Sequence, residues 1–142
     1  MAINFKLYNI NDPLKNKVTF IKNPSEQLKF SILEKALALI YTPDYEHFGI
    51  VPVEAMFACV PVITSATGGP LESVIDGVTG FHIENFSIEL VEKMKYFIKN
   101  PEKRDEMGHA GHAHCLEKFS TASLDKHLCR LITDLKENKL IK

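Results

Sequence analysis

The stretch Glu46-His47-Phe48-Gly49-Ile50-Val51-Pro52-Val53-Glu54 places two carboxylates on either side of a predicted helix start. Proline has no N–H and suits the first turn of a helix, so Pro52 predicts a helix that begins close to it. The N–H groups of Phe48 to Val51 would then lack partners within the helix. Such N–H groups bind anions, and carboxylates accept hydrogen bonds from hydroxyls. The stretch therefore predicts a site for a ligand with phosphate and hydroxyl groups, such as a nucleotide sugar.

An ordinary junction between a loop and a helix, with Glu54 solvated, would show the same spacing. Two features favour a binding site. Gly49 lies in the loop, and apolar residues surround Glu54 in the helix; they are Val51, Val53, Ala55 and Met56. A carboxylate beside a buried face usually has a hydrogen-bonding partner, which a ligand or another side chain can supply.

Short strands alternate with helices on both sides of this stretch. We expect strands at 18–21, 37–41, 60–64 and 80–83, and helices at 26–35, 52–58 and 71–75. Longer helices follow at 87–99, at 101–118 and from Ser120 onward, and the leucine stripe of the last one is expected in the core; its members are Leu124, Leu128, Leu131 and Leu135. This alternation predicts an α/β fold, a Rossmann-like parallel sheet with flanking helices.

A second motif, Gly68-Gly69, follows a predicted strand and precedes a predicted helix. Glycine amides can approach a phosphate or a sugar because no β-carbon intervenes. A plain tight turn is the alternative. Ligands of parallel sheets bind at the carboxyl ends of the strands, and both the 46–54 stretch and the glycine pair fall there.

Length and charge exclude several classes of protein. A chain of 142 residues fits one domain. The 17 Lys and Arg balance 18 Asp and Glu, so a nucleic-acid partner is not expected. The three cysteines indicate buried thiols in a reducing compartment rather than a disulfide framework. The N-terminus lacks the apolar core of a signal peptide, and no apolar run has the length of a membrane span, so we expect any membrane association to be peripheral.

Histidines cluster near residue 110 without the pattern of a metal site. His109 and His112 share a face of the predicted helix, whereas His114, next to Cys115, points elsewhere. No second cluster completes four ligands, so we expect surface or interhelix histidines and no metal.

Several strings occur in register with a known family. They are Glu-x7-Glu at 46–54, Glu54-Ala55-Met56, Pro61-Val62-Ile63, the Gly-Gly-Pro-Leu-Glu-Ser string at 68–73, and Gly77-Val78-Thr79-Gly80-Phe81. From about residue 17 to residue 119 the chain resembles the C-terminal lobe of retaining GT-B glycosyltransferases of family 4. Within that family it is most similar to the dolichol-pathway mannosyltransferases that add α-1,3 and α-1,6 mannoses to the growing lipid-linked oligosaccharide.

The resemblance implies GDP-mannose as the donor, with no metal and no other cofactor. By position, Glu54 would hold the ribose hydroxyls, and the amides of Ile50 and Val51 would meet the diphosphate. Glu46 would be the catalytic residue that holds the mannose and stabilises charge at the anomeric carbon, together with the amides of Phe48 and Gly49. His47, Gly68 and Gly69 complete the donor-binding set that the resemblance implies.

The resemblance also implies a domain division and a partner. We expect a poorly defined segment at 1–17 and an incomplete donor-binding lobe at 18–142, without the upstream Arg and Lys pair that would neutralise the diphosphate. The acceptor would be a lipid-linked oligosaccharide, bound through a missing N-terminal lobe on the cytosolic side of the endoplasmic reticulum membrane. The chain alone would bind nucleotide weakly and transfer nothing. Two alternatives stay open: a non-catalytic module for nucleotide sugars or for a protein partner, and a transferase that uses a UDP-sugar.

Overall fold

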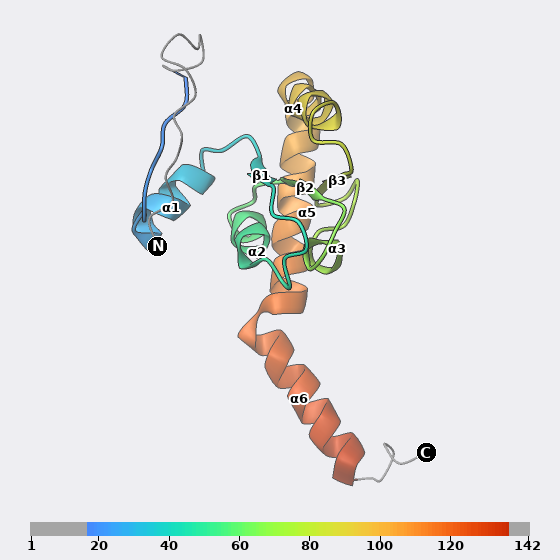
Figure 1. Ribbon diagram of the computed structural model, residues 1–142. Helices are drawn as coiled ribbons and strands as arrows, with labels where there is room; N and C mark the ends of the chain where they lie inside the picture. The colour runs from blue at the N-terminus through green and yellow to red at the C-terminus, as the bar shows by residue number, and fades with distance from the viewer. Residues whose placement is uncertain (1–16, 137–142) are drawn as a thin grey trace.

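The computed structural model describes residues 17–136, which form six helices and three strands (Figure 1). In chain order they are α1 (Glu26–Leu33), β1 (Leu39–Tyr41), α2 (Ile50–Phe57), β2 (Val62–Ser65), α3 (Pro70–Ser73), β3 (Gly80–Ile83), α4 (Glu89–Lys99), α5 (Pro101–Phe119) and α6 (Thr121–Lys136).

The three strands form one parallel sheet in the order β1-β2-β3. Ile40 of β1 lies opposite Ile63 of β2, which in turn lies opposite Phe81 of β3. Each pair of neighbouring strands is joined by a helical crossover, α2 for the first pair and α3 for the second. The predicted α/β fold with a Rossmann-like parallel sheet is therefore confirmed.

Helices cover both faces of the sheet, as the sequence predicted. All four residues of β2 are buried, because this strand is central and packed on both sides. On one face Val62 packs with Val53 and Met56 of α2. On the other face Ile63 packs with Phe97 of α4. Figure 1 shows α4 on one side of the sheet and α2 and α3 on the opposite side.

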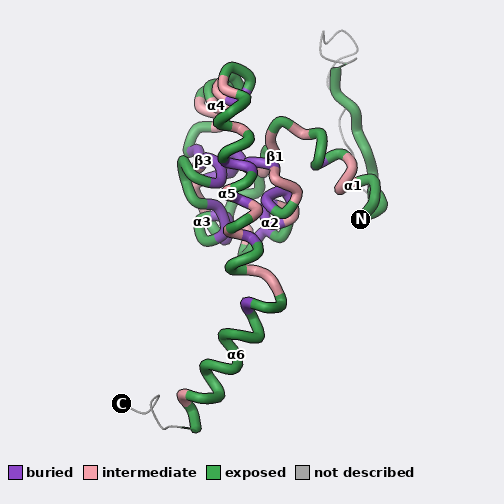
Figure 2. Tube along the Cα trace, turned by 180° about the vertical axis from the view of Figure 1, so that it is seen from behind, coloured by how far each residue is buried: buried purple, intermediate pink, exposed green. Residues whose placement is uncertain are grey.

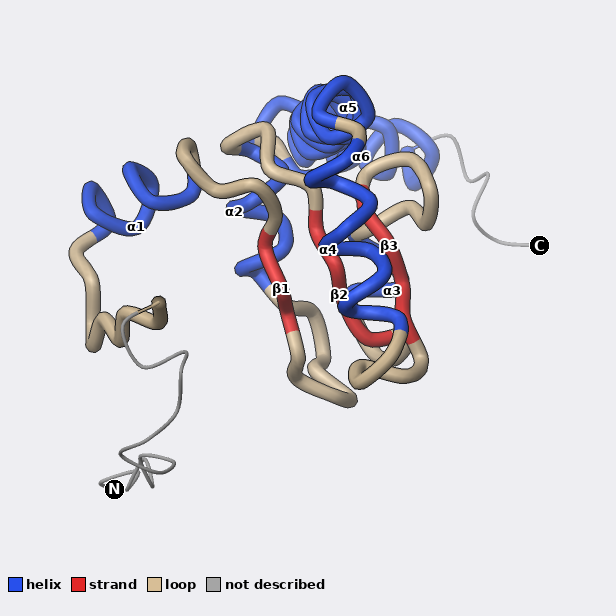
Figure 3. Tube along the Cα trace, turned by 90° about the horizontal axis from the view of Figure 1, so that it is seen from above, coloured by secondary structure: helices blue, strands red, loops and turns tan. Residues whose placement is uncertain are grey.

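Helix α5 crosses the sheet at the amino ends of the strands (Figure 3). There the Arg104 guanidinium donates a 2.7 Å hydrogen bond to the carbonyl of Ala36, just before β1. Gly108 lies against the backbone of Cys59, so a β-carbon at this position would collide with the Cys59 carbonyl. The opposite side of the sheet, where the loops after β1 and β2 begin, is not covered by this helix (Figure 3).

Two predictions about elements are wrong. Residues 18–21 form no strand; they are exposed, and the sheet pairs only β1, β2 and β3 among the described residues. The leucine stripe near the C-terminus lies outside the core, with exposed fractions of 66%, 52%, 50% and 60% at Leu124, Leu128, Leu131 and Leu135. The reason is that α6 leaves the body after Ser120 and projects away from it (Figure 1). The predicted segment at 1–17 falls almost wholly outside the described residues.

Candidate functional site

The two predicted motifs lie together at the carboxyl ends of β1 and β2. Side-chain hydroxyls join the loops that follow these strands. Ser65 Oγ donates to the Pro43 carbonyl at 3.1 Å, and Thr67 Oγ1 accepts the N–H of Tyr45 at 3.3 Å. The N–H of Gly69 donates to the Glu46 carbonyl at 2.6 Å. The glycine pair thus fixes the loop that carries Glu46.

Close approach of the two loops explains why glycine stands at both positions of the pair. A β-carbon on Gly68, whose φ is +65°, would lie 2.5 Å from the Glu46 carbonyl oxygen. One on Gly69 would collide with the backbone of His47 and Phe48. Because the Gly69 N–H already has a protein partner, the pair acts first in loop packing, and a ligand contact through that N–H would have to replace this bond.

The N-terminus of α2 presents four backbone N–H groups that have no hydrogen bond to any described residue; they belong to Phe48, Gly49, Ile50 and Val51. The helix begins at Ile50, two residues before Pro52. Gly49 directly before it adopts φ +74° and ψ +78°, a left-handed conformation that glycine reaches without strain. The helix dipole and these free N–H groups together favour an anion here.

Glu46 lies in the loop immediately before these four N–H groups, which we call the α2 cradle. Its side chain is partly buried. Its Oε1 accepts the N–H of the neighbouring His47 at 3.2 Å. Tyr41, at the end of β1, lies close by: a β-carbon on Gly49 would be 3.3 Å from its ring. Burial, followed by the nearby charge of Glu46, raises the pKa of the Tyr41 hydroxyl above its ordinary value. A neutral phenol and a carboxylate therefore line the loop side of the site.

Glu54 lies on α2 and already has a cationic partner. Its Oε1 accepts a 2.7 Å hydrogen bond from Lys29 Nζ, and both side chains are largely buried, with 21% and 24% exposed. Lys29 also contacts Glu26 at 2.9 Å within α1. The hydrogen bonds to Glu54 and Glu26 raise the pKa of Lys29 above its ordinary value. Glu54 is thus the partnered carboxylate that its apolar neighbours predicted, and its second oxygen has no partner among the described residues.

Sequence reasoning missed Lys29. The Glu26-x-x-Lys29 spacing within α1 is visible in the sequence, and it predicts the local pair. The contact with Glu54 joins positions 25 apart and depends on how α1 packs beside α2, where Phe30 and Phe57 meet edge to face with centroids 6.4 Å apart. No local pattern encodes that packing.

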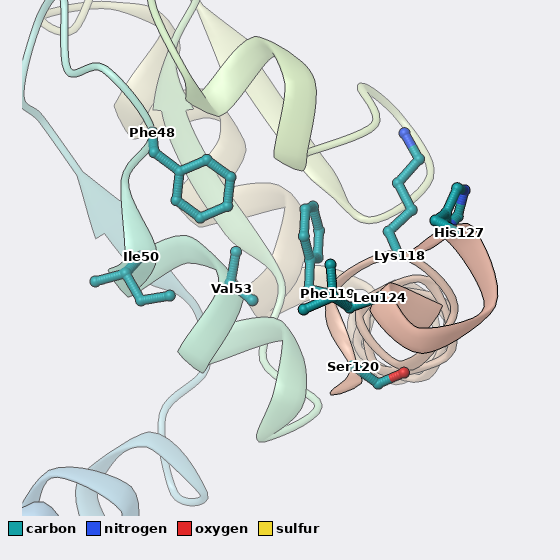
Figure 4. Close-up of a pocket in the computed structure, with 8 residues that line it drawn as sticks. All are labelled: Phe48, Ile50, Val53, Lys118, Phe119, Ser120, Leu124 and His127. Carbon is teal, nitrogen blue, oxygen red and sulfur yellow. The ribbon is translucent and has the colours of Figure 1, made fainter. Parts of the chain in front are cut away.

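A cavity of about 470 Å³ lies beside the cradle, between the start of α2 and the junction of α5 and α6 (Figure 4). Its walls are Phe48, Ile50, Val53, Lys118, Phe119, Ser120, Leu124 and His127. The rings of Phe48 and Phe119 meet edge to face with centroids 5.8 Å apart, which anchors the side chain of one cradle residue to α5. The side chain of Phe48 therefore packs against α5 at this cavity.

The histidines near residue 110 have separate neighbours. His112 Nδ1 lies 2.6 Å from the Phe57 carbonyl, whereas the His114 ring packs against Phe119. Between residues 17 and 136, no group of three His, Cys, Asp or Glu side chains could hold a metal ion. Over the same residues no helix has the length and apolar character needed to cross a membrane.

Comparison with known families and sequences gives a consistent result. A family model described as "Glycosyl transferases group 1" matches residues 4–114. The Alpha-1,3/1,6-mannosyltransferase ALG2 of Mus musculus is 43% identical over 122 residues, which are 86% of this chain and 29% of that protein. ALG2 of Homo sapiens is 43% identical over 118 residues, 83% of this chain and 28% of that protein. The chain therefore spans less than a third of the length of these relatives.

Solved structures show the same fold. Sucrose-phosphate synthase from Thermosynechococcus elongatus superposes with a TM-score of 0.70 and 25% identity, over 88% of this chain and 32% of that one. HepE of Anabaena in complex with UDP-glucose superposes with a TM-score of 0.70 and 23% identity, over 85% and 33% of the two chains. Each likeness covers about one third of the other, longer chain.

Proposed function

The chain belongs to the group 1 glycosyl transferases and has the fold of part of a GT-B C-terminal lobe, and from this premise we propose that it binds GDP-mannose for a retaining mannosyltransferase. The observation that carries the proposal is the 43% identity to mannosyltransferases over a region that contains the whole α2 cradle. The reaction class of the family and the mannosyltransferase activity for which the relatives are named point to transfer of a hexose, here mannose.

Each part of the site has a role in donor binding. The free N–H groups of Ile50 and Val51 hold the diphosphate at the start of α2. Glu54, oriented by Lys29, accepts hydrogen bonds from the ribose hydroxyls through its unpartnered oxygen. Glu46 and the N–H groups of Phe48 and Gly49 hold the mannose. His47 and the glycine pair keep this loop in place.

The same arrangement suits the transfer step. As the bond between the anomeric carbon and the leaving phosphate oxygen breaks, negative charge grows on the diphosphate, where the α2 N–H groups stabilise it. Positive charge grows on the anomeric carbon, where the Glu46 carboxylate stabilises it. The acceptor hydroxyl forms the new bond on the same face and gives its proton to the leaving diphosphate. No metal ion takes part in this scheme.

The likeness to the mannosyltransferase relatives supports a proposal for the acceptor and the location. We propose a dolichol-linked oligosaccharide acceptor and a place on the cytosolic side of the endoplasmic reticulum membrane, with peripheral membrane contact. Because the chain spans 29% of the mouse relative, we propose that these 142 residues supply donor binding, and that transfer needs an N-terminal lobe such as the rest of the relatives' length would contain.

Calorimetry with GDP-mannose tests the donor assignment. We expect binding by the unaltered chain and at least tenfold weaker binding, about 1.4 kcal/mol, for both Glu46→Ala and Glu54→Ala. Glu92→Ala, an exposed carboxylate on α4, is the matched control and should bind as the unaltered chain does. Equal affinity for all four proteins would refute the assignment.

The open alternatives need two further experiments. Competition between GDP and UDP decides the nucleotide, and tighter binding of UDP would replace GDP-mannose by a UDP-sugar, the ligand class named for HepE. Adding a purified N-terminal lobe of a relative and measuring mannose transfer separates an enzyme lobe from a binding module. Donor binding without transfer in that mixture would favour the module.

A further inference from the structure

The hydroxyl of Tyr41 lies beside the α2 cradle, at the end of β1. Leu39 and Tyr41 are two residues apart and so point to the same face of the strand. Both pack against the core cluster that contains Val53 of α2. Figure 2 shows buried residues gathered where the strands meet α2 and α3. The core therefore holds the ring of Tyr41 in place.

Gly49 of the cradle rests against this side chain. A β-carbon on Gly49 would be 3.3 Å from the ring of Tyr41 and 3.5 Å from its hydroxyl oxygen. It would also be 3.5 Å from Cγ of Pro70, at the start of α3. Tyr41 and Pro70 therefore support Gly49 from one side, and the phenol places a polar atom next to the cradle.

The Tyr41 hydroxyl and the Glu46 carboxylate have complementary free groups. The hydroxyl forms no hydrogen bond with any described residue. Oε1 of Glu46 accepts the N–H of His47, whereas Oε2 has no partner in the described part of the chain. The two residues are close enough for the charge of Glu46 to raise the pKa of Tyr41, after the larger effect of burial. A protonated phenol near a carboxylate is a hydrogen-bond donor near an acceptor.

The loop fixes the backbone of Glu46 more firmly than its carboxylate. The Gly69 N–H donates to the Glu46 carbonyl at 2.6 Å. The carboxylate has the His47 N–H, at 3.2 Å, which is the long end of the usual range. A side chain that holds a ligand in one geometry needs supporting hydrogen bonds that fix its rotamer. A second contact to Glu46 would supply that support.

We propose that Tyr41 is a positioning residue of the donor site, whose hydroxyl donates a hydrogen bond to Oε2 of Glu46 and holds that carboxylate toward the hexose. This inference rests on the proposed function, in which Glu46 holds the hexose. An ionised carboxylate has about four acceptor sites, so the bond from Tyr41 leaves acceptors for the sugar hydroxyls. The nucleotide contacts proposed at Ile50, Val51 and Glu54 do not involve this pair, so the hydroxyl matters for the sugar and not for the nucleotide.

Calorimetry with GDP-mannose and with GDP tests the assignment. Tyr41→Phe removes the hydroxyl and keeps the ring in the core. We expect about tenfold weaker binding of GDP-mannose, the usual effect of losing a hydrogen bond to a charged group. Binding of GDP should be unchanged, because GDP lacks the sugar that Glu46 holds. The control Tyr45→Phe makes the same chemical change in the neighbouring loop, where the side chain is 81% exposed, and should bind both ligands as the unaltered chain does.

The possible results separate the inference from the proposed function. Equal affinity of Tyr41→Phe and the unaltered chain for GDP-mannose would overturn the inference and leave the proposed function intact. Equal weakening toward GDP-mannose and GDP would also overturn it, since the hydroxyl would then have only a structural role. An unaltered chain that binds neither ligand would contradict the proposed function, and with it the role of Tyr41 toward the hexose.

A titration without ligand tests the contact between Tyr41 and Glu46 directly. The chemical shift of ¹³C-labelled Tyr41, followed as the pH rises, reports the ionisation of its hydroxyl. We expect Glu46→Gln to lower the pKa of Tyr41, because a nearby negative charge is removed. Glu92→Gln, at an exposed position on α4, should leave that pKa unchanged. An unchanged pKa of Tyr41 in Glu46→Gln would overturn the inference even where the donor binds.

Discussion

Gly69 has no room for a side chain, because a β-carbon would collide with Phe48 and lie 2.5 Å from the His47 carbonyl oxygen. We therefore expect Gly69→Ala to lower the free energy of unfolding by about 1–3 kcal/mol, the usual range for overpacking. Urea denaturation measures this. Gly77→Ala is the comparison: nothing lies within 4 Å of its β-carbon, and only its φ of +72° opposes the change, at about 1 kcal/mol. A larger loss at Gly77 would contradict the packing of the two loops.

Lys29 orients Glu54, so replacing Lys29 should weaken donor binding. We expect Lys29→Met to weaken GDP-mannose binding about tenfold, because the Glu54 carboxylate loses the ammonium that holds it at 2.7 Å. Methionine keeps most of the length of the aliphatic stem. Lys22→Met, at an exposed position outside α1, should leave the affinity unchanged in the same titration. Equal affinities for the two variants would mean that Lys29 serves only the packing of α1.

At the level of single residues the sequence indicated the carboxylates, the N–H cradle and the glycine pair, because each has a local signature. The expectation that Glu54 has a partner is confirmed. The identity of that partner, Lys29, depends on contacts between elements that no spacing rule gives. The roles of Glu46 and Glu54 toward a donor stay predictions.

Helix α5 lies against the turn that follows α2, where Gly108 meets Cys59, whose φ is +57°. A methyl group there has to separate the two backbones, since the colliding atom is a carbonyl oxygen. We expect Gly108→Ala to cost about 1–3 kcal/mol in the free energy of unfolding. Ala113→Gly, at an exposed position on the same helix, should cost about 1 kcal/mol through helix propensity alone. Thermal unfolding of both variants measures the two losses in the free energy of unfolding. Equal losses would contradict the close contact between Gly108 and Cys59.

The same interface buries the Cys115 thiol, 3.7 Å from the Val53 carbonyl. Burial raises the pKa of this thiol above its ordinary value. In the unfolded chain the Cys115 thiol ionises near its ordinary pKa. The stability that its burial contributes is therefore complete below that ordinary pKa and is lost as the pH rises through the higher pKa of the folded state. We expect the free energy of unfolding to fall more steeply in the unaltered chain than in Cys115→Ala as the pH rises past the ordinary pKa of a thiol. Parallel pH profiles would contradict the burial.

Elements with a strong local pattern were predicted well, and those that need a distant neighbour were not. The strand at 80–83 and the helix start near Pro52 follow from composition and a proline. Residues 18–21 have strand-forming side chains, yet they are not part of the described sheet, which consists of β1, β2 and β3. The leucine stripe of α6 has the period of a buried helix. The period of the apolar residues shows that one face of a helix packs against something, but it does not show which part of the protein that is.

At the scale of the whole molecule the described residues form one sheet with helices on both faces, and α6 projects away from it (Figure 1). The parallel order of the strands fixes where the loops with Glu46 and Gly69 meet, and α5 occupies the other end of the sheet. The likeness to larger glycosyltransferases extends over about a third of each of them. In the function proposed above, the described residues supply the donor-binding loops, and acceptor binding needs a second lobe.

The most direct test of the central claim, that the start of α2 holds the diphosphate of the donor, is a titration of ¹⁵N-labelled chain with GDP-mannose followed by amide chemical shifts. The account predicts the largest changes at the N–H groups of Phe48, Gly49, Ile50 and Val51, which have no partner among the described residues. Changes confined to the cavity walls on α5 and α6, with these four amides unmoved at saturation, would contradict it.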